Sequence, residues 1–223
     1  MKKMKFGILL AFAVIVLVSV ASALPSSTTA SVNVQSGPSY FKITTATGDS
    51  ELMAGPYDGW CSGFDIHGIG DQTKPYNVYD SRGDLSALPL YITTTNWNKV
   101  NWIINNPNPD WKITQAAIWK VDGGSGVDYP SDTYTLGYSE TEFLAYMELV
   151  KEQGGFVPTT GQYYAAVFDK EYEKDGKIVI GQPVIIPVFI PPINTPEFPT
   201  LALPMAMLIG VVGVVEYFRV KKE

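Results

Sequence analysis

The sequence predicts an α+β domain in which an antiparallel β-sheet or sandwich packs against two or three helices. Two observations carry this prediction: several short segments have strand-like composition or alternation, and two other segments repeat their apolar residues at helical spacing. The chain has 223 residues, of which 46% are apolar and 17% charged. This composition suits one medium globular domain with accessory segments and argues against a disordered chain.

Strand chemistry occurs at several places along the chain. Residues 41–45 and 76–79 alternate like strands, and residues 164–168 have the composition of a strand. A charged hairpin is predicted at residues 174–177, and a further strand is predicted over residues 178–190. We expect these segments to form the antiparallel sheet.

Two helices are predicted between the strand segments. The first covers residues 96–104 and ends before Pro107, and its apolar face is formed by Trp97, Val100 and Ile104. The second begins at a capping box in residues 139–142 and ends at Gly154. Its apolar stripe consists of Phe143, Met147 and Val150.

The N-terminus has the layout of a secretory signal peptide. Three lysines in the first five residues precede an apolar run at residues 6–20, and small residues follow at 21–23. We expect residues 1–23 to be removed by cleavage after Ala23, and the alternative is an uncleaved membrane anchor. Residues 24–38 are rich in Ser and Thr and are predicted to be a flexible spacer before a domain at residues 39–190.

An apolar segment near the C-terminus predicts a transmembrane helix. Residues 200–218 are apolar apart from Glu216, a length that can cross a bilayer, and residues 219–223 form a basic tail. Because basic flanks favour the cytoplasmic side, the domain at residues 39–190 is expected to be extracellular. The alternative is a buried core helix, which a helix apolar on every face fits poorly.

A short motif stands directly before this apolar segment. A Pro-rich linker at residues 191–199 ends in the motif Pro196, Glu197, Phe198 and Pro199. The motif, apolar helix and basic tail together resemble the PEF-CTERM sorting signal of archaeal surface proteins. The resemblance implies that an archaeosortase cuts near the motif and transfers the protein to a lipid or other surface anchor. A protein processed in this way keeps no transmembrane span.

Composition also excludes several kinds of site. The chain has one Cys and one His, which cannot assemble a Cys/His zinc site, and one Cys cannot form an internal disulfide. We expect no metal and no cofactor. A net charge of −6, with no basic cluster outside the two ends, argues against nucleic-acid binding.

One cysteine and one glutamine stand out as candidates for chemistry. Cys61 follows Trp60 in a Gly-rich segment, and Gln115 lies in the run Thr-Gln-Ala-Ala-Ile-Trp at residues 114–119. Together these stretches resemble the thioester domain of bacterial surface adhesins, also called the TQXA domain, over about residues 55–190. The resemblance implies a thioester-domain-like fold and an internal thioester bond between Cys61 and Gln115.

The chemistry of such a bond needs only these two side chains and a dry environment. A thiolate that attacks a Gln carboxamide expels ammonia and leaves an acyl–sulfur bond, which an amine or hydroxyl can open. Because water would hydrolyse an exposed bond, apolar neighbours must shield it. The expected shielding residues are Trp60, Ile118 and Trp119. His67 or Asp65 could act as a base, although we expect His67 to be structural.

These observations predict a surface-anchored, adhesin-like binding protein that couples covalently to an amine-bearing surface protein or polymer. It reacts once and is not an enzyme. The alternative is a structural cell-envelope protein of the same fold and anchoring, in which Cys61 is a small buried hydrophobe and Gln115 caps or pairs within a helix. A cysteine hydrolase using Cys61 and His67 is disfavoured, because their close spacing leaves no room for an oxyanion hole and no nucleophile elbow is present.

Overall fold

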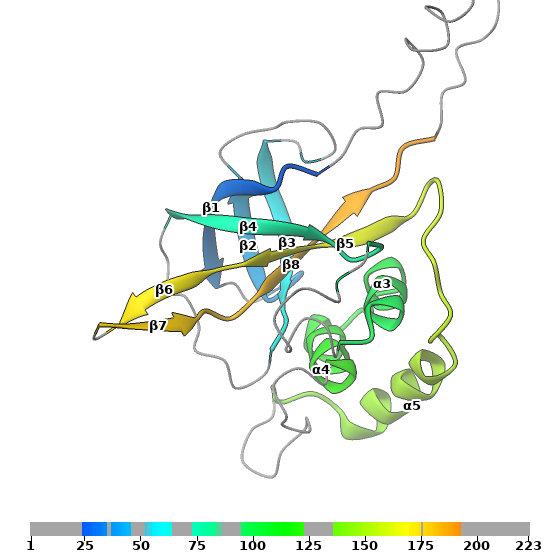
Figure 1. Cartoon of the computed structure of the whole chain (residues 1–223). Helices are drawn as coiled ribbons and strands as arrows, with labels where there is room; N and C mark the ends of the chain where they lie inside the picture. Colours follow the sequence, from blue (N-terminus) through cyan, green and yellow to red (C-terminus); the bar gives the residue numbers. More distant parts are fainter. Residues whose placement is uncertain are drawn as a thin grey trace, which may run out of the picture. The chain divides into compact units, whose positions relative to one another are not determined.

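The computed structural model describes residues 24–34, 37–45, 52, 54–63, 73–83, 85, 95–122, 136–174 and 176–192. The chain divides into two units, Met1–Ile190 and Pro191–Glu223, and almost all of the described residues belong to the first. In the described part of this unit, antiparallel strands are joined by three helices (Figure 1). This arrangement confirms the predicted α+β class.

Six of the described strands form a closed antiparallel barrel. They are β1 (Ser27–Val34), β2 (Phe41–Thr45), β3 (Gly55–Cys61), β4 (Thr73–Asp80), β5 (Tyr163–Asp169) and β8 (Val184–Phe189). Their order is β1-β2-β3-β8-β5-β4, and β4 pairs with β1 to close the ring. The antiparallel pairing agrees with the predicted sheet, whereas its closure into a barrel is a feature that the sequence did not predict.

Strand β1 corrects the prediction of a flexible spacer at residues 24–38. Thr28, Ala30 and Val32 are buried, and the residues between them are more exposed, which is the two-residue alternation of a strand. β1 pairs with β2 on one side and with β4 on the other. The Ser/Thr-rich composition resembles that of a linker, but Thr also has high β-propensity, and small side chains suffice to cover this part of the core.

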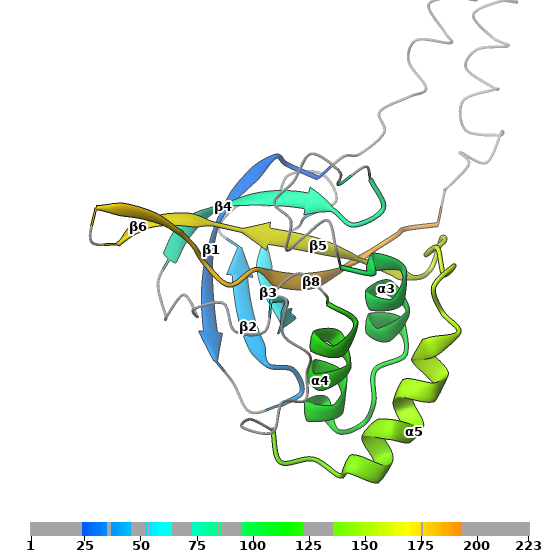
Figure 2. The ribbon, with the colours of Figure 1, turned by 60° about the horizontal axis from the view of Figure 1, so that its bottom comes forward.

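The other predicted strands are found, except that the long strand predicted at residues 178–190 is divided into two. Residues 41–45 form β2, residues 76–79 lie in β4, and residues 164–168 lie in β5. The predicted hairpin consists of β6 (Glu171–Lys174) and β7 (Lys177–Ile180), which extends away from the barrel in Figures 1 and 2. The predicted strand at residues 178–190 is interrupted before β8 by a short segment ending in Pro183, a residue that cannot donate to a strand ladder.

Three helices begin at side-chain caps. They are α3 (Trp97–Asn105), α4 (Trp111–Val121) and α5 (Glu140–Lys151). Asn96, Asp110 and Ser139 each accept a hydrogen bond from a backbone N–H in the first turn of the helix that follows. Helices α3 and α5 confirm the two predicted helices, whereas the sequence did not place α4.

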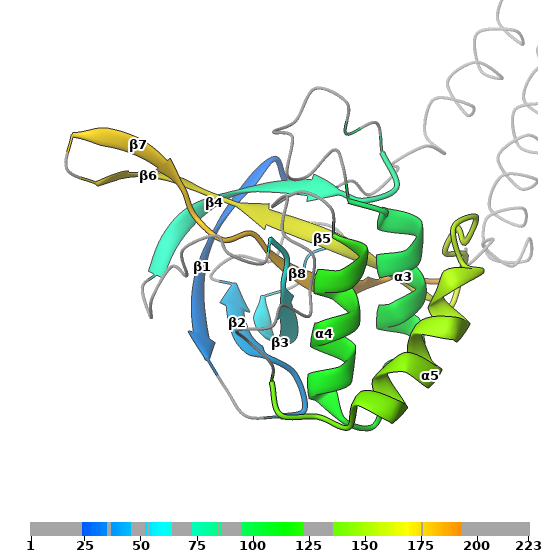
Figure 3. The ribbon, with the colours of Figure 1, turned by 90° about the horizontal axis from the view of Figure 1, so that it is seen from below.

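Helix α4 lies between the barrel and α5 (Figures 2 and 3). It contacts β3, α3 and α5, and α3 also contacts β5. As a result, seven consecutive residues of α4, from Ile113 to Trp119, are buried. This burial brings the polar side chain of Gln115 into the core next to β3, while the buried Thr114 hydroxyl bonds to the backbone of Asn108.

Several predictions concern parts of the chain outside the described residues. These are the signal peptide at residues 1–23, the motif at residues 196–199, the apolar segment at residues 200–218 and the tail at residues 219–223. Among the helices of the described residues, none has both the length and the apolar character needed to span a bilayer.

Candidate functional site

Cys61 is the last residue of β3 and is completely buried. Only two residue pairs join β3 to β8, namely Trp60 with Ile185 and Cys61 with Val184. Directly after them, the backbone N–H of Ser62 donates to the carbonyl of Pro183 at 2.9 Å. The backbone that carries the thiol is therefore fixed by the start of β8.

The structure brings the two predicted partners together, although they lie far apart in the sequence. The Cys61 backbone N–H donates to Oε1 of Gln115 at 2.8 Å, and Nε2 of Gln115 donates to the Cys61 carbonyl at 2.8 Å. The Gln115 side chain is completely buried, like that of Cys61. Because both polar ends of the carboxamide have partners, its burial leaves no polar group of this side chain unsatisfied.

Trp119 covers the sulfur directly. It lies one helical turn after Gln115 on α4, and its indole N–H donates to Cys61 Sγ at 3.2 Å. The ring of Tyr40, which the sequence analysis did not single out, packs edge-on against Trp119 with a centroid distance of 5.7 Å. The other two expected shielding residues, Trp60 and Ile118, are both buried in the surrounding core.

The environment of the thiol disfavours its charged form. Burial raises the pKa of Cys61 well above its ordinary value, the negative charge of Asp122 raises it further, and the hydrogen bond from Trp119 partly opposes them. The free thiol is therefore protonated at neutral pH. Any nucleophilic attack by this sulfur requires that its proton leave during the reaction.

A buried carboxylate that the sequence analysis missed lies at the end of α4. Asp122 is only 2% exposed and accepts hydrogen bonds from the Ser62 hydroxyl at 2.9 Å, the Thr95 hydroxyl at 2.5 Å and the Gly63 backbone N–H. It follows Gln115 by seven residues, which is two helical turns. This spacing alone does not mark the residue, and no sequence motif points to it.

A second carboxamide was also missed. Gln182 precedes β8, is half-buried, and donates through Nε2 to the carbonyl of Gly63 at 3.2 Å. Its contact is with the backbone two residues after Cys61, whereas Gln115 contacts Cys61 itself. Nothing in its local sequence distinguishes it from an ordinary residue of a loop.

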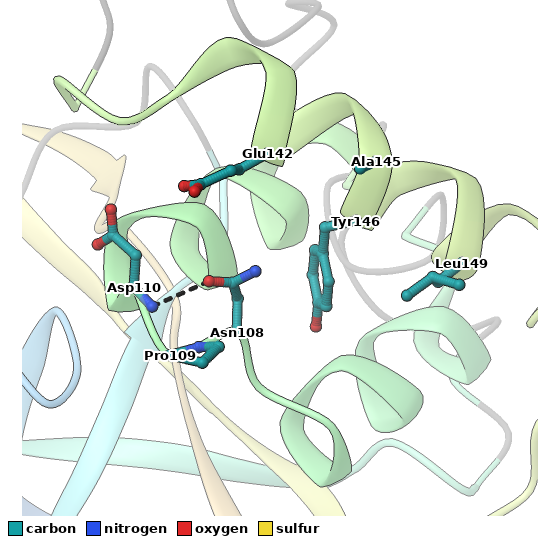
Figure 4. A pocket seen from close by; sticks show the side chains of 7 residues that line it. All are labelled: Asn108, Pro109, Asp110, Glu142, Ala145, Tyr146 and Leu149. Atoms are coloured by element: carbon teal, nitrogen blue, oxygen red, sulfur yellow. Dashed lines mark hydrogen bonds between the residues drawn. The ribbon is translucent and has the colours of Figure 1, made fainter.

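A shallow groove of about 530 Å³ lies beside the turn between α3 and α4 (Figure 4). It is lined by Asn108, Pro109, Asp110, Glu142, Ala145, Tyr146 and Leu149. Two of its polar groups are engaged in local structure: Asn108 accepts from the backbone N–H of Asp110, and the Tyr146 hydroxyl donates to the Asn106 carbonyl. The groove includes neither Cys61 nor Gln115.

Asp65 and His67, the two candidate bases, lie outside the described residues. No cluster of His, Cys, Asp or Glu side chains able to hold a metal ion is found in the described part of the chain. Comparison of the chain with family models, curated proteins and solved structures finds no match. The functional proposal therefore depends on the motifs and on the geometry around Cys61.

Proposed function

We propose that this chain is a cell-surface binding protein with a thioester-domain-like fold that attaches covalently to amine-bearing targets through an internal Cys61–Gln115 thioester. The observation that supports this most is the double hydrogen bond between the Gln115 carboxamide and the backbone of Cys61, in a completely buried setting. The protein reacts once with its target, so it is a binding protein and not an enzyme.

Bond formation can be written with the groups present. Cys61 Sγ attacks Cδ of Gln115, the C–N bond breaks, and ammonia leaves with the proton of the thiol. Negative charge develops on Oε1 during the attack, and the Cys61 N–H already donates to that oxygen, so it acts as an oxyanion-stabilising donor. The departing nitrogen gives up its hydrogen bond to the Cys61 carbonyl.

Coupling to a target is the second step. An amine of the target attacks the same acyl carbon, the C–S bond breaks, and the thiol of Cys61 regains a proton. The target is then joined to Gln115 by an amide bond. Burial of the pair and cover by Trp119 and Tyr40 support this step, because exclusion of water slows the competing hydrolysis.

Intact-mass measurement tests the proposed bond. The purified mature protein is expected to weigh one ammonia less than the mass calculated for the residues it retains, and its unfolded chain is expected to resist thiol alkylation. Methylamine should then add its full mass and release an alkylatable Cys61. A mass equal to that calculated value, together with alkylation of Cys61 in the untreated unfolded chain, would contradict the bond.

The same contacts of Gln115 also fit a second candidate, a structural cell-envelope protein without the bond. Both ends of the Gln115 carboxamide are already used by the Cys61 backbone, an arrangement that also suits a purely structural polar pair. The raised pKa of the Cys61 thiol fits an inert buried cysteine as well. The mass measurement separates the two candidates, since only the first loses ammonia.

The location of the protein is also part of the proposal. The leader at residues 1–23 and the motif at residues 196–199 support secretion, processing by an archaeosortase and attachment to a membrane or lipid anchor. Protease added to intact cells is expected to release peptides from residues 39–190, and none that extend past the motif. A cytoplasmic protein serves as the control for lysis. Complete protection of the domain would contradict its extracellular location.

A further inference from the structure

We infer that Asp122 is a positioning residue for the Cys61–Gln115 pair, because its carboxylate fastens the end of β3 to the end of α4 and so keeps the thiol covered beside the carboxamide. This inference extends the proposed function by assigning a role to a residue outside the bond. It rests on that function only for the effect on bond formation, since the covering of the thiol can be measured separately.

The contacts of Asp122 join the two elements that carry the pair. Cys61 ends β3, and the next two residues, Ser62 and Gly63, both donate to Oδ2 of Asp122. Gln115 is carried by α4, and Asp122 is the residue that caps this helix at its C-terminal end. Oδ1 of Asp122 accepts from Thr95, which lies just before α3. One carboxylate therefore links three parts of the chain around the site.

The position of this acid is unfavourable for a residue with no further role. The C-terminal end of a helix carries partial negative charge, which repels a carboxylate. Burial adds a desolvation cost, which a neutral residue of similar size would avoid. Hydrogen bonds to a charged acceptor are stronger than those to a neutral one, so the charge holds Ser62 and Gly63 firmly on α4.

The test measures how fast Cys61 is alkylated in the native protein after methylamine treatment, so that the thiol is free whether or not a bond had formed. Asp122→Ala is expected to raise this rate about tenfold or more, because it removes three hydrogen bonds that cover the site. The fraction of molecules that lack one ammonia before treatment should fall in the same variant.

Two further variants separate positioning from general stability. Asp122→Asn should give a rate between those of the wild type and Asp122→Ala, because its carboxamide oxygen can still accept from Ser62 and Gly63 but lacks the charge that strengthens those hydrogen bonds. Val150→Ala makes a cavity in the buried face of α5 and lowers stability without touching Asp122, so it should not reproduce the effect.

Each variant has a result that would overturn the positioning role of Asp122. Alkylation of Asp122→Ala at the wild-type rate, or of Asp122→Asn as fast as Asp122→Ala, would overturn the positioning role. If Asp122→Ala does not fold, Ser62→Ala removes one of the hydrogen bonds and should still raise the rate, and an unchanged rate would overturn the role. If the wild-type protein has lost no ammonia, the thioester is contradicted but the positioning role is not, because the alkylation rates test the role of Asp122 separately.

Discussion

Replacing Gln115 with Ala is expected to abolish the loss of ammonia completely, and Cys61→Ala is expected to do the same, because each variant removes one half of the bond. Gln115→Ala also leaves the buried N–H and carbonyl of Cys61 without their partners, which costs about 1–3 kcal/mol of stability for each buried polar group. Intact mass measures the first effect, and the midpoint of urea unfolding measures the second.

Gln182 provides the matched control for this experiment. Gln182 is a second glutamine near Cys61. Its side-chain amide donates to the carbonyl of Gly63 and not to that of Cys61. Gln182→Ala is therefore expected to keep the ammonia deficit. If Gln182→Ala abolished the deficit while Gln115→Ala retained it, the acyl group would belong to Gln182 and the assignment of Gln115 would be wrong.

Gly59→Ala is expected to give the largest loss of stability among conservative changes in β3. A Cβ at this position would overlap Cδ1 of Ile43 and lie 3.0 Å from the backbone oxygen of Ile185. Ile43 is completely buried, so its side chain has little room to move, and overpacking of this kind costs about 1–3 kcal/mol. The change should appear as a lower midpoint of urea unfolding.

Gly155 is the matched control for the glycine variant. A Cβ there would meet no atom within 4 Å, and the residue lies in an exposed turn after α5. Gly155→Ala should therefore change the free energy of unfolding by no more than about 0.5 kcal/mol. Equal unfolding midpoints for Gly59→Ala and the wild type would show that the barrel accommodates the extra carbon.

Among the helices, the sequence predicted the two whose burial is more one-sided. Helix α5 exposes one face and α3 has one half-buried face, so their apolar residues recur at helical spacing, and caps such as Ser139 mark where they begin. Helix α4 has neighbours on several sides, and its run of buried residues erases that spacing. Strand β1 was missed for another reason, since its Ser and Thr residues obscured a regular alternation in burial.

The candidate site was predictable only where a local motif marks it. Cys61 is the single cysteine, and Gln115 lies in a recognisable run, so both could be selected from the sequence. Asp122 is defined by partners that are distant along the chain, such as Thr95 and Ser62. Contacts of this kind arise from the packing of α4 against β3, which composition and periodicity do not encode.

The antiparallel pairing of β8 has a mechanical consequence for a protein tethered at one end and coupled to a target at the other. Under the proposed attachment, tension runs from Gln115, beside the start of β8, to the chain that follows Ile190 at its end. The component of this pull along β8 loads the pairs that join β8 to β5. These six residue pairs would then share the load in shear, so they would have to break together and could not unzip one at a time.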